Sequence, residues 1–577
     1  MEMKEMLYSC AVAQTKNVDE EAGLLVYYVK STSGGDHSEG VEAIHGLRQS
    51  SFYAALVLCN GFEAFYHQGL QAAEALCDLQ DVREGSRTFG LWPLTKEQNL
   101  DETYFPDYNW ADFIGKNLQD IVQFSKCPLP EGLKAKLLTA IRNAAICSIR
   151  RNVGLDYSNI AVMSCLTIIC AGEILQDAEI FQNGKARLQR LCAYMRFNGS
   201  YSEYNSSTYA LTVLGDVNRM LYAIRDPECV AMAKKLNFYV WKMIGAHYNS
   251  CLKQLSPPQA RAYRDLEDGS VSYMVWCGTR GKYGAPMSEK LFNPELEYML
   301  ELICPGLTCP EEALPYFEGE EKFLADTYYK KNDLRTEGED YTIVRDPDNP
   351  DMTAFTLRTP GFSMGVFSLC DTWVQRRNCM VVWDQEKPKC FRLRGIVCDY
   401  DFCGGVLYAR QKENQILGQL GLVTDRGRVH YIIDKEKNGI YETDTLHFRF
   451  DLGGACEDLT IRQEGKDFLV EDGELTIKLH IEKWLYDGKD APVYVSEDGK
   501  SVILEGYQGE KTMLDTNILA ETCGVFTMTV EDPTHKAVEA PLSWELVNGK
   551  LSSRWGALVV ESPAKPVTYR EALGLKA

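Results

Sequence analysis

The stretch Asn198-Gly-Ser-Tyr-Ser-Glu-Tyr-Asn-Ser-Ser-Thr-Tyr209 joins a glycine turn to a dense cluster of polar side chains, and it opens an apolar segment from Ala210 to Ile224. That segment has helical spacing, so the cluster lies at a helix N-terminus, where backbone N–H groups have no partner inside the helix. One hydroxyl is sufficient to cap that end, and capping alone remains the alternative explanation for residues 206–208. The surplus of carboxylate, amide and phenol groups favours a binding site. The expected site residues in this stretch are Glu203, Tyr204, Asn205 and Tyr209.

A second polar patch, Asp156-Tyr-Ser-Asn159, precedes the first by about one helical hairpin. It also opens an apolar helical segment. Polar side chains that gather at helix N-termini can line a binding site, because their phenol and amide groups add to the N–H groups that have no partner inside the helix. We therefore expect Tyr157 and Asn159 to contribute to the site.

The chain has 577 residues, which is too many for one ordinary core, so we expect two domains or a large toroid with a second unit. Its net charge of −21, without a lysine or arginine block, argues against a nucleic-acid partner. Twenty cysteines without a regular framework are typical of reduced thiols. The start Met1 to Leu7 lacks a secretory pattern, and the apolar run Ile160 to Gly172 is too short to span a bilayer. We expect a soluble cytoplasmic protein with no membrane partner, and homo-oligomer formation is left open.

The first half of the chain is helical in pattern. Apolar residues recur at helical spacing around 118–122, 137–145 and 162–170, and further helices are expected near 184–195, 208–224 and 228–248. Short polar links join them into antiparallel pairs, which predicts stacked hairpins that close on themselves. Residues 1–265 are therefore expected to form an (α/α) toroid that carries the catalytic site.

The second half has the sequence pattern of an antiparallel β-sandwich. Short strand-like segments, including 380–383, 391–397, 429–433 and 446–450, alternate with turn signals such as Asn438-Gly439. Many short strands without intervening helices favour this architecture. We expect residues 266–340 to form a linker with a helical insertion at 308–333, and 341–577 to form the sandwich. The predicted fold class is thus an α+β multidomain chain.

Three further groups of residues are candidates for the site. The stretch Asp107-Tyr-Asn-Trp-Ala-Asp112 could hold a sugar by stacking and hydrogen bonding, and a helix cap with Trp110 as a packing staple is the alternative. Arg261 could grip a carboxylate in bidentate fashion, or form a salt bridge between domains. Arg376 and Arg377, if on a strand, point to opposite faces, so at most one serves a site. The candidate substrate-binding residues from these groups are Asn109, Trp110, Gln259, Arg261, Tyr263, Trp373, Gln375 and Arg376.

Two histidines are candidates for catalysis. His247 ends an expected helix and could face the site, although a partner for the helix dipole is the alternative. His430 is a core or surface residue unless its sheet face meets the toroid. The cysteine pairs have no metal-binding spacing, so we expect no metal and no cofactor.

These features together resemble the heparinase II/III-like and alginate-lyase-like superfamily, whose members pair an incomplete (α/α) toroid with an antiparallel β-sheet domain. The family pattern D-G-x-x-x-E-x-S-x-x-Y is similar to the stretch from Asn198 to Tyr209, with Glu203 and Ser206 in order. The family's upstream asparagine corresponds to Asn159, with Ile160 where a histidine often stands. The segment from Trp373 to Arg377 is similar to a sandwich strand with a Gln-Arg-Arg-Pro core, and Asn378 replaces the proline.

The resemblance implies β-elimination on a uronate-containing oligosaccharide or polysaccharide. That reaction needs a group to neutralise the uronate carboxylate, a base and an acid. By resemblance, Asn159 would neutralise, Tyr209 would act as base and acid, and Arg261 or one of Arg376 and Arg377 would hold the carboxylate. A phenol requires a nearby cation to act as a base near neutral pH.

Two other functions fit the same expected fold. Many (α/α) toroids host inverting glycosidases, which need two carboxylates across the sugar, and Glu203 with Asp112 would be the pair. A non-catalytic carbohydrate-binding protein would need neither carboxylate.

Overall fold

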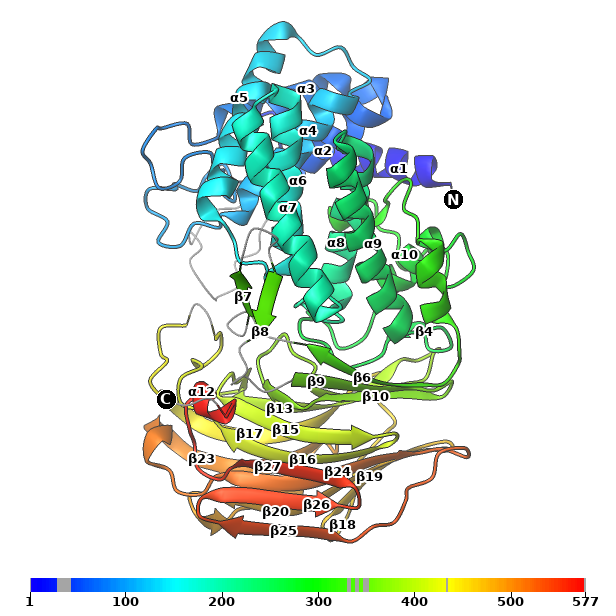
Figure 1. Ribbon diagram of the computed structural model, residues 1–577, viewed down its shortest axis with the longest axis vertical. Coiled ribbons are helices and arrows are strands. Elements are labelled where there is room, and N and C mark those ends of the chain that lie inside the picture. Colours follow the sequence, from blue (N-terminus) through cyan, green and yellow to red (C-terminus); the bar gives the residue numbers. More distant parts are fainter. Residues whose placement is uncertain are drawn as a thin grey trace.

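The computed structural model describes residues 2–27, 43–328, 334–337, 342–345, 352–431 and 434–574. A helical body and a layered β body are stacked along the long axis of the molecule (Figure 1). The chain therefore has an N-terminal (α/α) toroid followed by a C-terminal antiparallel β-sandwich, and the expected fold class is confirmed.

The helices of the first body begin and end where the sequence provides caps. Asp177 accepts hydrogen bonds from two backbone N–H groups of the first turn of its helix, and Ser206 and Asp226 each cap the helix that follows. The helices of this body are α1 (Met3–Thr15), α2 (Leu47–Asn60), α3 (Tyr66–Asp78), α4 (Asn109–Phe124), α5 (Glu131–Arg151), α6 (Ser158–Leu175), α7 (Ala178–Asn198), α8 (Ser207–Ala223), α9 (Pro227–His247), α10 (Ser270–Gly278) and α11 (Tyr298–Leu302), with 3-10 turns η1 (Glu63–Phe65) and η2 (Glu311–Phe317).

Helix α6 runs through the centre of the helical body. It contacts α4, α5, α7 and α8, and its residues from Ser158 to Gly172 are all buried. It is also the one helix of the described ranges whose length and composition would suit a bilayer, and 83% of that window is buried inside the protein. The apolar character of α6 is thus accounted for by its place in the core.

Two large antiparallel sheets form the sandwich. The first has the order β22-β23-β17-β13-β12-β10-β9-β6, with β14 paired to β13, and the second has the order β11-β15-β16-β24-β20-β19-β18, with β21 paired to β20. The strands of the first are β6 (Lys322–Tyr328), β9 (Met352–Arg358), β10 (Phe362–Phe367), β12 (Cys379–Trp383), β13 (Lys389–Val397), β14 (Tyr400–Asp401), β17 (Ile440–Gly454), β22 (Val493–Val495) and β23 (Ser501–Asp515). Those of the second are β11 (Leu369–Asp371), β15 (Gly405–Lys412), β16 (Gln415–Leu422), β18 (Arg462–Glu464), β19 (Asp467–Asp472), β20 (Leu475–Tyr486), β21 (Lys489–Asp490) and β24 (Cys523–Glu531).

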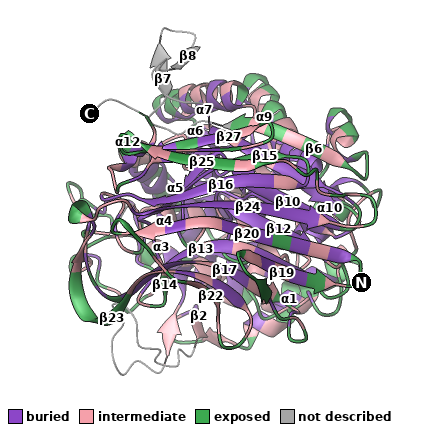
Figure 2. Ribbon diagram, turned by 90° about the horizontal axis from the view of Figure 1, so that it is seen from below, coloured by how far each residue is buried: buried purple, intermediate pink, exposed green. Residues whose placement is uncertain are grey.

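Apolar residues from both sheets form one core, which includes Phe391 and Phe450 from the first and Phe526 from the second. A third sheet, β25 (Leu542–Val547), β26 (Lys550–Trp555) and β27 (Leu558–Pro563), covers the outside of the second together with α12 (Tyr569–Ala572). Seen from below in Figure 2, the central strands are buried, whereas β25 carries exposed residues.

The segment 266–340 is divided between the two bodies. Helices α10 and α11 and the turn η2 belong to the helical core, which extends to Phe317. Strand β6 then pairs with β9 along the edge of the first sheet, so the segment expected to be helical at 308–333 contains a single 3-10 turn and a strand within its described part. The helical core continues beyond 265 because Phe317 stacks on Tyr283 and packs near Trp241.

Five other short strands lie outside the two large sheets. They are β1 (Val18–Asp19), β2 (Leu24–Tyr27), β3 (Ile44–His45), β4 (Tyr248–Asn249) and β5 (Gln254–Leu255). The hairpin β7 (Leu334–Glu337) and β8 (Thr342–Arg345) is a separate pair. The strand expected at 429–433 does not form, since its described residues 429–431 belong to a loop.

Candidate active site at the junction of the two bodies

The segment 256–263 leaves the helical body and pairs with a loop of the sandwich. The backbone N–H of Gln259 donates to the carbonyl of Arg377 at 3.1 Å, and the reverse bond is 2.9 Å. The N–H of Ala262 donates to the carbonyl of Gln375 at 2.7 Å. These bonds fix Arg261, which lies between the two pairs, where the helical body meets the sandwich. Figure 1 shows the two bodies next to each other, with β9 and β10 on the side of the helices.

Contact between this segment and the first sheet depends on a glycine. A Cβ atom added to Gly365 of β10 would lie 2.0 Å from the carbonyl oxygen of Pro257. The same carbonyl accepts a hydrogen bond from Thr356 Oγ1 at 2.8 Å. The close approach of two backbones therefore requires glycine at position 365.

Arg261 is the centre of the candidate site. Its Nη1 donates to Glu203 Oε1 at 2.6 Å, and its Nη2 donates to the Tyr209 hydroxyl at 3.0 Å. Nε and Nη2 both donate to Gln375 Oε1, at 3.0 and 2.9 Å. One planar guanidinium thus joins the start of α8, the loop before it and the sandwich.

Glu203 connects Arg261 to the start of α6. Its carboxylate accepts the backbone N–H of Asn159 at 2.8 Å and the side-chain amide of Asn159 at 2.8 and 2.9 Å. Glu203 is 5% exposed and Asn159 is 1% exposed. Burial raises the pKa of Glu203, while the charge of Arg261 and the N–H groups of Asn159 oppose that shift. The carboxylate orients its neighbours and is almost shielded from solvent.

Tyr209 presents its hydroxyl at the accessible side of this network. Its backbone N–H donates to the capping Ser206 Oγ at 3.0 Å, which fixes the residue in the first turn of α8. Its hydroxyl lies 2.7 Å from that of Tyr263, which is 59% exposed. Burial raises the pKa of Tyr209 above its ordinary value although Arg261 opposes the shift. The phenol is therefore protonated at neutral pH and is suited to donate a proton.

Aromatic rings surround the Arg261 guanidinium. Its central carbon lies 4.3 Å from the ring centroid of Tyr209 and 5.4 Å from those of Tyr157 and Trp373. The Asn109 amide lies 3.4 Å from the Tyr157 hydroxyl. This side of the junction can offer stacking surfaces and an amide to a sugar.

His430 approaches the same junction from the sandwich. Its ring centroid lies 5.3 Å from that of Trp373, and the ring stacks on Tyr431 at 5.6 Å. Burial and the nearby charge of Arg261 lower the pKa of His430. The imidazole is therefore neutral near pH 7 and can accept a proton.

His247 belongs to a separate buried network. Its Nε2 lies 2.7 Å from the Tyr204 hydroxyl, which also donates to Asp326 Oδ2 at 2.8 Å, and its Nδ1 contacts the carbonyl of Met243 at 2.8 Å. His247 and Tyr204 are each 1% exposed. The structure thus places both predicted residues where they brace β6 against the helical body, away from the Arg261 contacts.

Two predicted site residues stabilise the loop geometry instead. Asn205, with a positive φ of 51°, donates from its amide to the carbonyls of Ser256 and Pro258 at 2.7 and 2.9 Å. Gln259 forms the backbone bridge to the sandwich and is 5% exposed. Both residues hold the segment that carries Arg261.

Asp112 and Trp110 do not fit the sugar-binding role expected for them. Asp112 is fully buried in α4, and burial raises its pKa to about 6. Trp110 packs on Phe113 with ring centroids 5.8 Å apart and lies 5.6 Å from the Arg48 guanidinium. The first turn of a helix presents neighbouring residues to different sides, so Asn109 alone of this group points to Tyr157.

The two arginines after Gln375 are also placed differently from expectation. They lie in the loop between β11 and β12 rather than on a strand. Arg376 is bound to Asp371, which also pairs with Arg426, and Arg377 Nε lies 2.6 Å from Asp265. Both arginines are buried and hold the loop, so neither is the carboxylate partner.

Sequence reasoning missed two residues of these networks. Arg151 Nη1 donates to Asn109 Oδ1 at 2.6 Å and so positions that amide. Asp326 contacts Tyr204 from β6. Arg151 ends α5, where a cation is common, and Asp326 lies in the segment 308–333, for which a helical insertion was expected.

Glu267, just after this segment, makes stability depend on pH. Burial and the adjacent Asp268 raise its pKa to about 8 from an ordinary 4.5. Between those values the folded protein binds more protons than the unfolded chain, so its free energy of unfolding falls as pH rises. We expect Glu267→Gln to stabilise the protein more at pH 9 than at pH 5, by at least about 1 kcal/mol. Urea unfolding at both pH values measures the change in the free energy of unfolding. Glu295→Gln, at an exposed position, is the matched control. Equal effects of Glu267→Gln at both pH values would contradict the prediction.

Within the described ranges, no group of three or more histidine, cysteine, aspartate or glutamate side chains is arranged to hold a metal ion. The candidate site consists of protein side chains from the starts of α6 and α8, the 256–263 segment and the β11–β12 loop, and His430 approaches it from the loop after β16.

The fold and the site define a two-body protein, a helical toroid on a β-sandwich, with a tyrosine–arginine–glutamate–asparagine network at the junction. Residues 6–298, which are 293 of the 577, match the family described as "Domain of unknown function (DUF8769)", and the chain belongs to that family. A comparison with curated proteins finds no match.

Solved structures similar to this chain include polysaccharide lyases. A chondroitinase AC lyase studied in oligosaccharide complexes has 9% identity and a TM-score of 0.44, over 97% of this chain and 88% of that one. The Streptomyces coelicolor A3 chondroitin AC lyase in complex with chondroitin sulphate has 10% identity and a TM-score of 0.45, over 97% and 84%. The heparinase III product of BT4657 has 9% identity and a TM-score of 0.37, over 98% and 92%.

Proposed function

We propose that the protein is a carbohydrate-active lyase that cleaves a uronate-containing oligosaccharide or polysaccharide by β-elimination. The observation that supports it most is the contact of 3.0 Å between the Tyr209 hydroxyl and Arg261 Nη2, beside the buried pair of Glu203 and Asn159. A protonated phenol next to a fixed cation at an accessible junction matches the chemistry of that reaction.

The proposed reaction balances within the substrate. A base removes the proton from the carbon next to the uronate carboxylate, a carbon–carbon double bond forms, and the bond to the glycosidic oxygen breaks. The leaving oxygen takes a proton from the enzyme, and the base later returns one. No water is added to the product.

The roles follow from the protonation states in the site. Tyr209, protonated at neutral pH, donates to the leaving oxygen. His430, whose lowered pKa leaves it neutral, is the proposed base. Arg261 stabilises the charge that builds on the uronate, and Glu203 with Asn159 keeps the guanidinium in place. This assignment divides between two residues the acid and base roles that the resemblance gave to Tyr209 alone.

A glycosidase that uses Glu203 and Asp112 has no support in the geometry. Asp112 is fully buried, and Glu203 accepts hydrogen bonds from both Asn159 and Arg261. An inverting glycosidase needs two carboxyl groups that face the sugar with room for a water. Neither side chain meets that requirement.

We further propose that the enzyme acts on imported oligosaccharides in the cytoplasm. All twenty cysteines are free thiols, as expected in a reducing compartment. Many of them lie within packed cores. Faster turnover of disaccharides than of long chains would agree with such a substrate.

The first test is turnover of uronate-containing oligosaccharides, followed by ultraviolet absorbance of the new double bond. We expect absorbance to rise without a mass increase from water, and His430→Ala to lose most of that rate while retaining the melting temperature. Cleavage with added water and no absorbance would replace the lyase by a hydrolase. Binding without cleavage of any oligosaccharide in the panel would indicate the non-catalytic function.

A further inference from the structure

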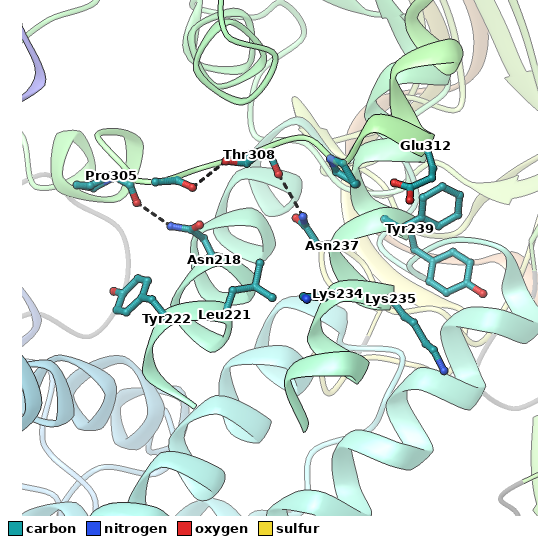
Figure 3. Close-up of a pocket in the computed structure, with 13 residues that line it drawn as sticks. Asn218, Leu221, Tyr222, Lys234, Lys235, Asn237, Tyr239, Pro305, Thr308 and Glu312 are labelled. Atoms are coloured by element: carbon teal, nitrogen blue, oxygen red, sulfur yellow. Dashed lines mark hydrogen bonds between the residues drawn. The ribbon is translucent and has the colours of Figure 1, made fainter. Parts of the chain in front are cut away.

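A cavity of about 300 Å³ lies within the helical body, among α1, α2, α4, α8 and α11. None of the residues that surround it belongs to the Arg261 network. It shares Asn218, Tyr222 and Pro305 with a larger cavity of about 740 Å³ between α8, α9 and the 305–312 segment. In Figure 3, Asn218 and Tyr222 lie on the α8 side of that larger cavity, facing Pro305.

Ion pairs line one wall of the smaller cavity. Lys116 Nζ lies 2.7 Å from Asp216 Oδ1, Arg219 Nε lies 3.4 Å from Asp120 Oδ2, and Arg48 Nη2 lies 3.0 Å from Glu301 Oε1. Behind them, Arg48 also pairs with Glu297.

The charges of this wall do not balance. The lining has two cations, Lys116 and Arg219, against three carboxylates, Asp120, Asp216 and Glu301, and the Arg48–Glu297 pair lies behind it, which makes three cations against four carboxylates in all. With every group ionised the net charge is −1, and burial raises the pKa of Glu297 to about 7, so a monocation nearby would favour the ionised form of that carboxyl.

Two polar atoms of the residues that line the cavity have no hydrogen-bond partner among the described residues. They are Asp216 Oδ2 and Arg219 Nη1. Asp216 is 1% exposed, so its second oxygen cannot be satisfied by bulk solvent. Buried polar atoms are ordinarily paired, and an unpaired acceptor next to an unpaired donor indicates a missing partner. Because residues 216 and 219 are three apart on α8, both atoms belong to one face of the helix.

Most of the remaining lining is apolar, with Asn60, Thr212 and Asn218 as its polar members. The apolar part includes Phe52, Leu56 and Leu211, and also Leu300 and Ile303. A ligand must therefore present a charged end to Asp216 and an apolar body to these side chains.

We infer that this cavity binds a small amphipathic primary amine, whose ammonium pairs with Asp216 Oδ2 and whose neighbouring oxygen accepts from Arg219 Nη1. The class comprises amino alcohols with an apolar side chain. The ammonium supplies the missing positive charge, the oxygen supplies the missing acceptor, and the body fills the apolar part.

The test is calorimetric titration of the full-length protein with three related probes. Phenylalaninol has the ammonium, the oxygen and the apolar ring, 2-phenylethylamine lacks the oxygen, and 2-phenylethanol lacks the ammonium. We expect saturable binding of phenylalaninol, at least about 10-fold tighter than that of 2-phenylethanol. Binding of 2-phenylethylamine should be intermediate. Absence of saturable binding by both amines, or equal binding of the alcohol, would overturn the inference.

Variants locate the site. Asp216→Asn should weaken phenylalaninol by at least about 10-fold, whereas the exposed control Asp458→Asn should leave its affinity unchanged. Arg219→Met should abolish the difference in affinity of the protein for phenylalaninol and for 2-phenylethylamine. Leu211→Trp fills the apolar part of the cavity without removing a charge, so it should block binding. It tests the site independently of Asp216→Asn, in case that variant lowers the melting temperature. Undiminished binding by Leu211→Trp would place the amine elsewhere and overturn the assignment.

Discussion

Tyr209→Phe should reduce the rate of elimination by roughly 10³-fold while leaving the fold intact. The change removes one hydroxyl, the group that lies 3.0 Å from Arg261 Nη2 and that is proposed to protonate the leaving oxygen. The ring and its packing against the guanidinium, at 4.3 Å, remain. Steady-state rates from ultraviolet absorbance measure the loss, and circular dichroism with a melting curve verifies the fold.

Tyr263→Phe is the matched control, because it deletes the hydroxyl 2.7 Å from that of Tyr209. Among the hydrogen bonds of the described residues, Tyr263 contacts Tyr209 and neither Glu203 nor Arg261, so we expect a loss of roughly 10-fold or less. Similar losses in the two variants would mean that the pair of phenols acts as a unit. Full activity of Tyr209→Phe would eliminate the proposed acid.

Arg261→Gln should destabilise the protein by about 3 kcal/mol, in addition to abolishing turnover. Glu203 is 5% exposed, and removal of the guanidinium leaves its carboxylate buried without a cation. Part of the stability lost in Arg261→Gln should be recovered when Glu203→Gln is added, because a neutral side chain needs no counter-charge. Urea unfolding of the two single variants and the double variant gives the coupling energy.

Arg264→Gln provides the comparison for this cycle. Arg264 is 60% exposed and pairs with Asp268 on the surface, where an ion pair contributes little. We expect a change below about 1 kcal/mol. If Arg261→Gln were equally mild, or if Glu203→Gln failed to recover stability in the double variant, the buried pair would not hold the site together.

Much of the architecture could be predicted from local patterns. The helical spacing near 137–145 and 162–170 corresponds to α5 and α6, and the serine before residue 207 caps α8 as expected. Strands β12 and β13 lie where alternation indicated them. Periodicity and caps act within a few residues, so the sequence displays them directly.

The site was predicted in part. Asn159, Glu203, Tyr209 and Arg261 were each singled out, and the structure brings them together. The interpretation of Asp112 as a carboxylate facing the site did not hold, since it is fully buried. A polar residue at a helix start has the same local signature whether its side chain faces a site or the core, and only packing separates the two.

The sequence by itself determined where many of the helices and strands lie, which polar clusters open α6 and α8, and that a toroid is followed by a sandwich. Tertiary structure alone decided that Arg261 meets Glu203, Tyr209 and Gln375, and that His430 reaches the junction whereas His247 does not. It also decided that Asp216 Oδ2, beside a cavity, has no hydrogen-bond partner among the described residues. The physical reason is distance along the chain. Capping and periodicity arise between neighbours, whereas these contacts join residues up to 114 positions apart, whose meeting depends on how the two bodies dock.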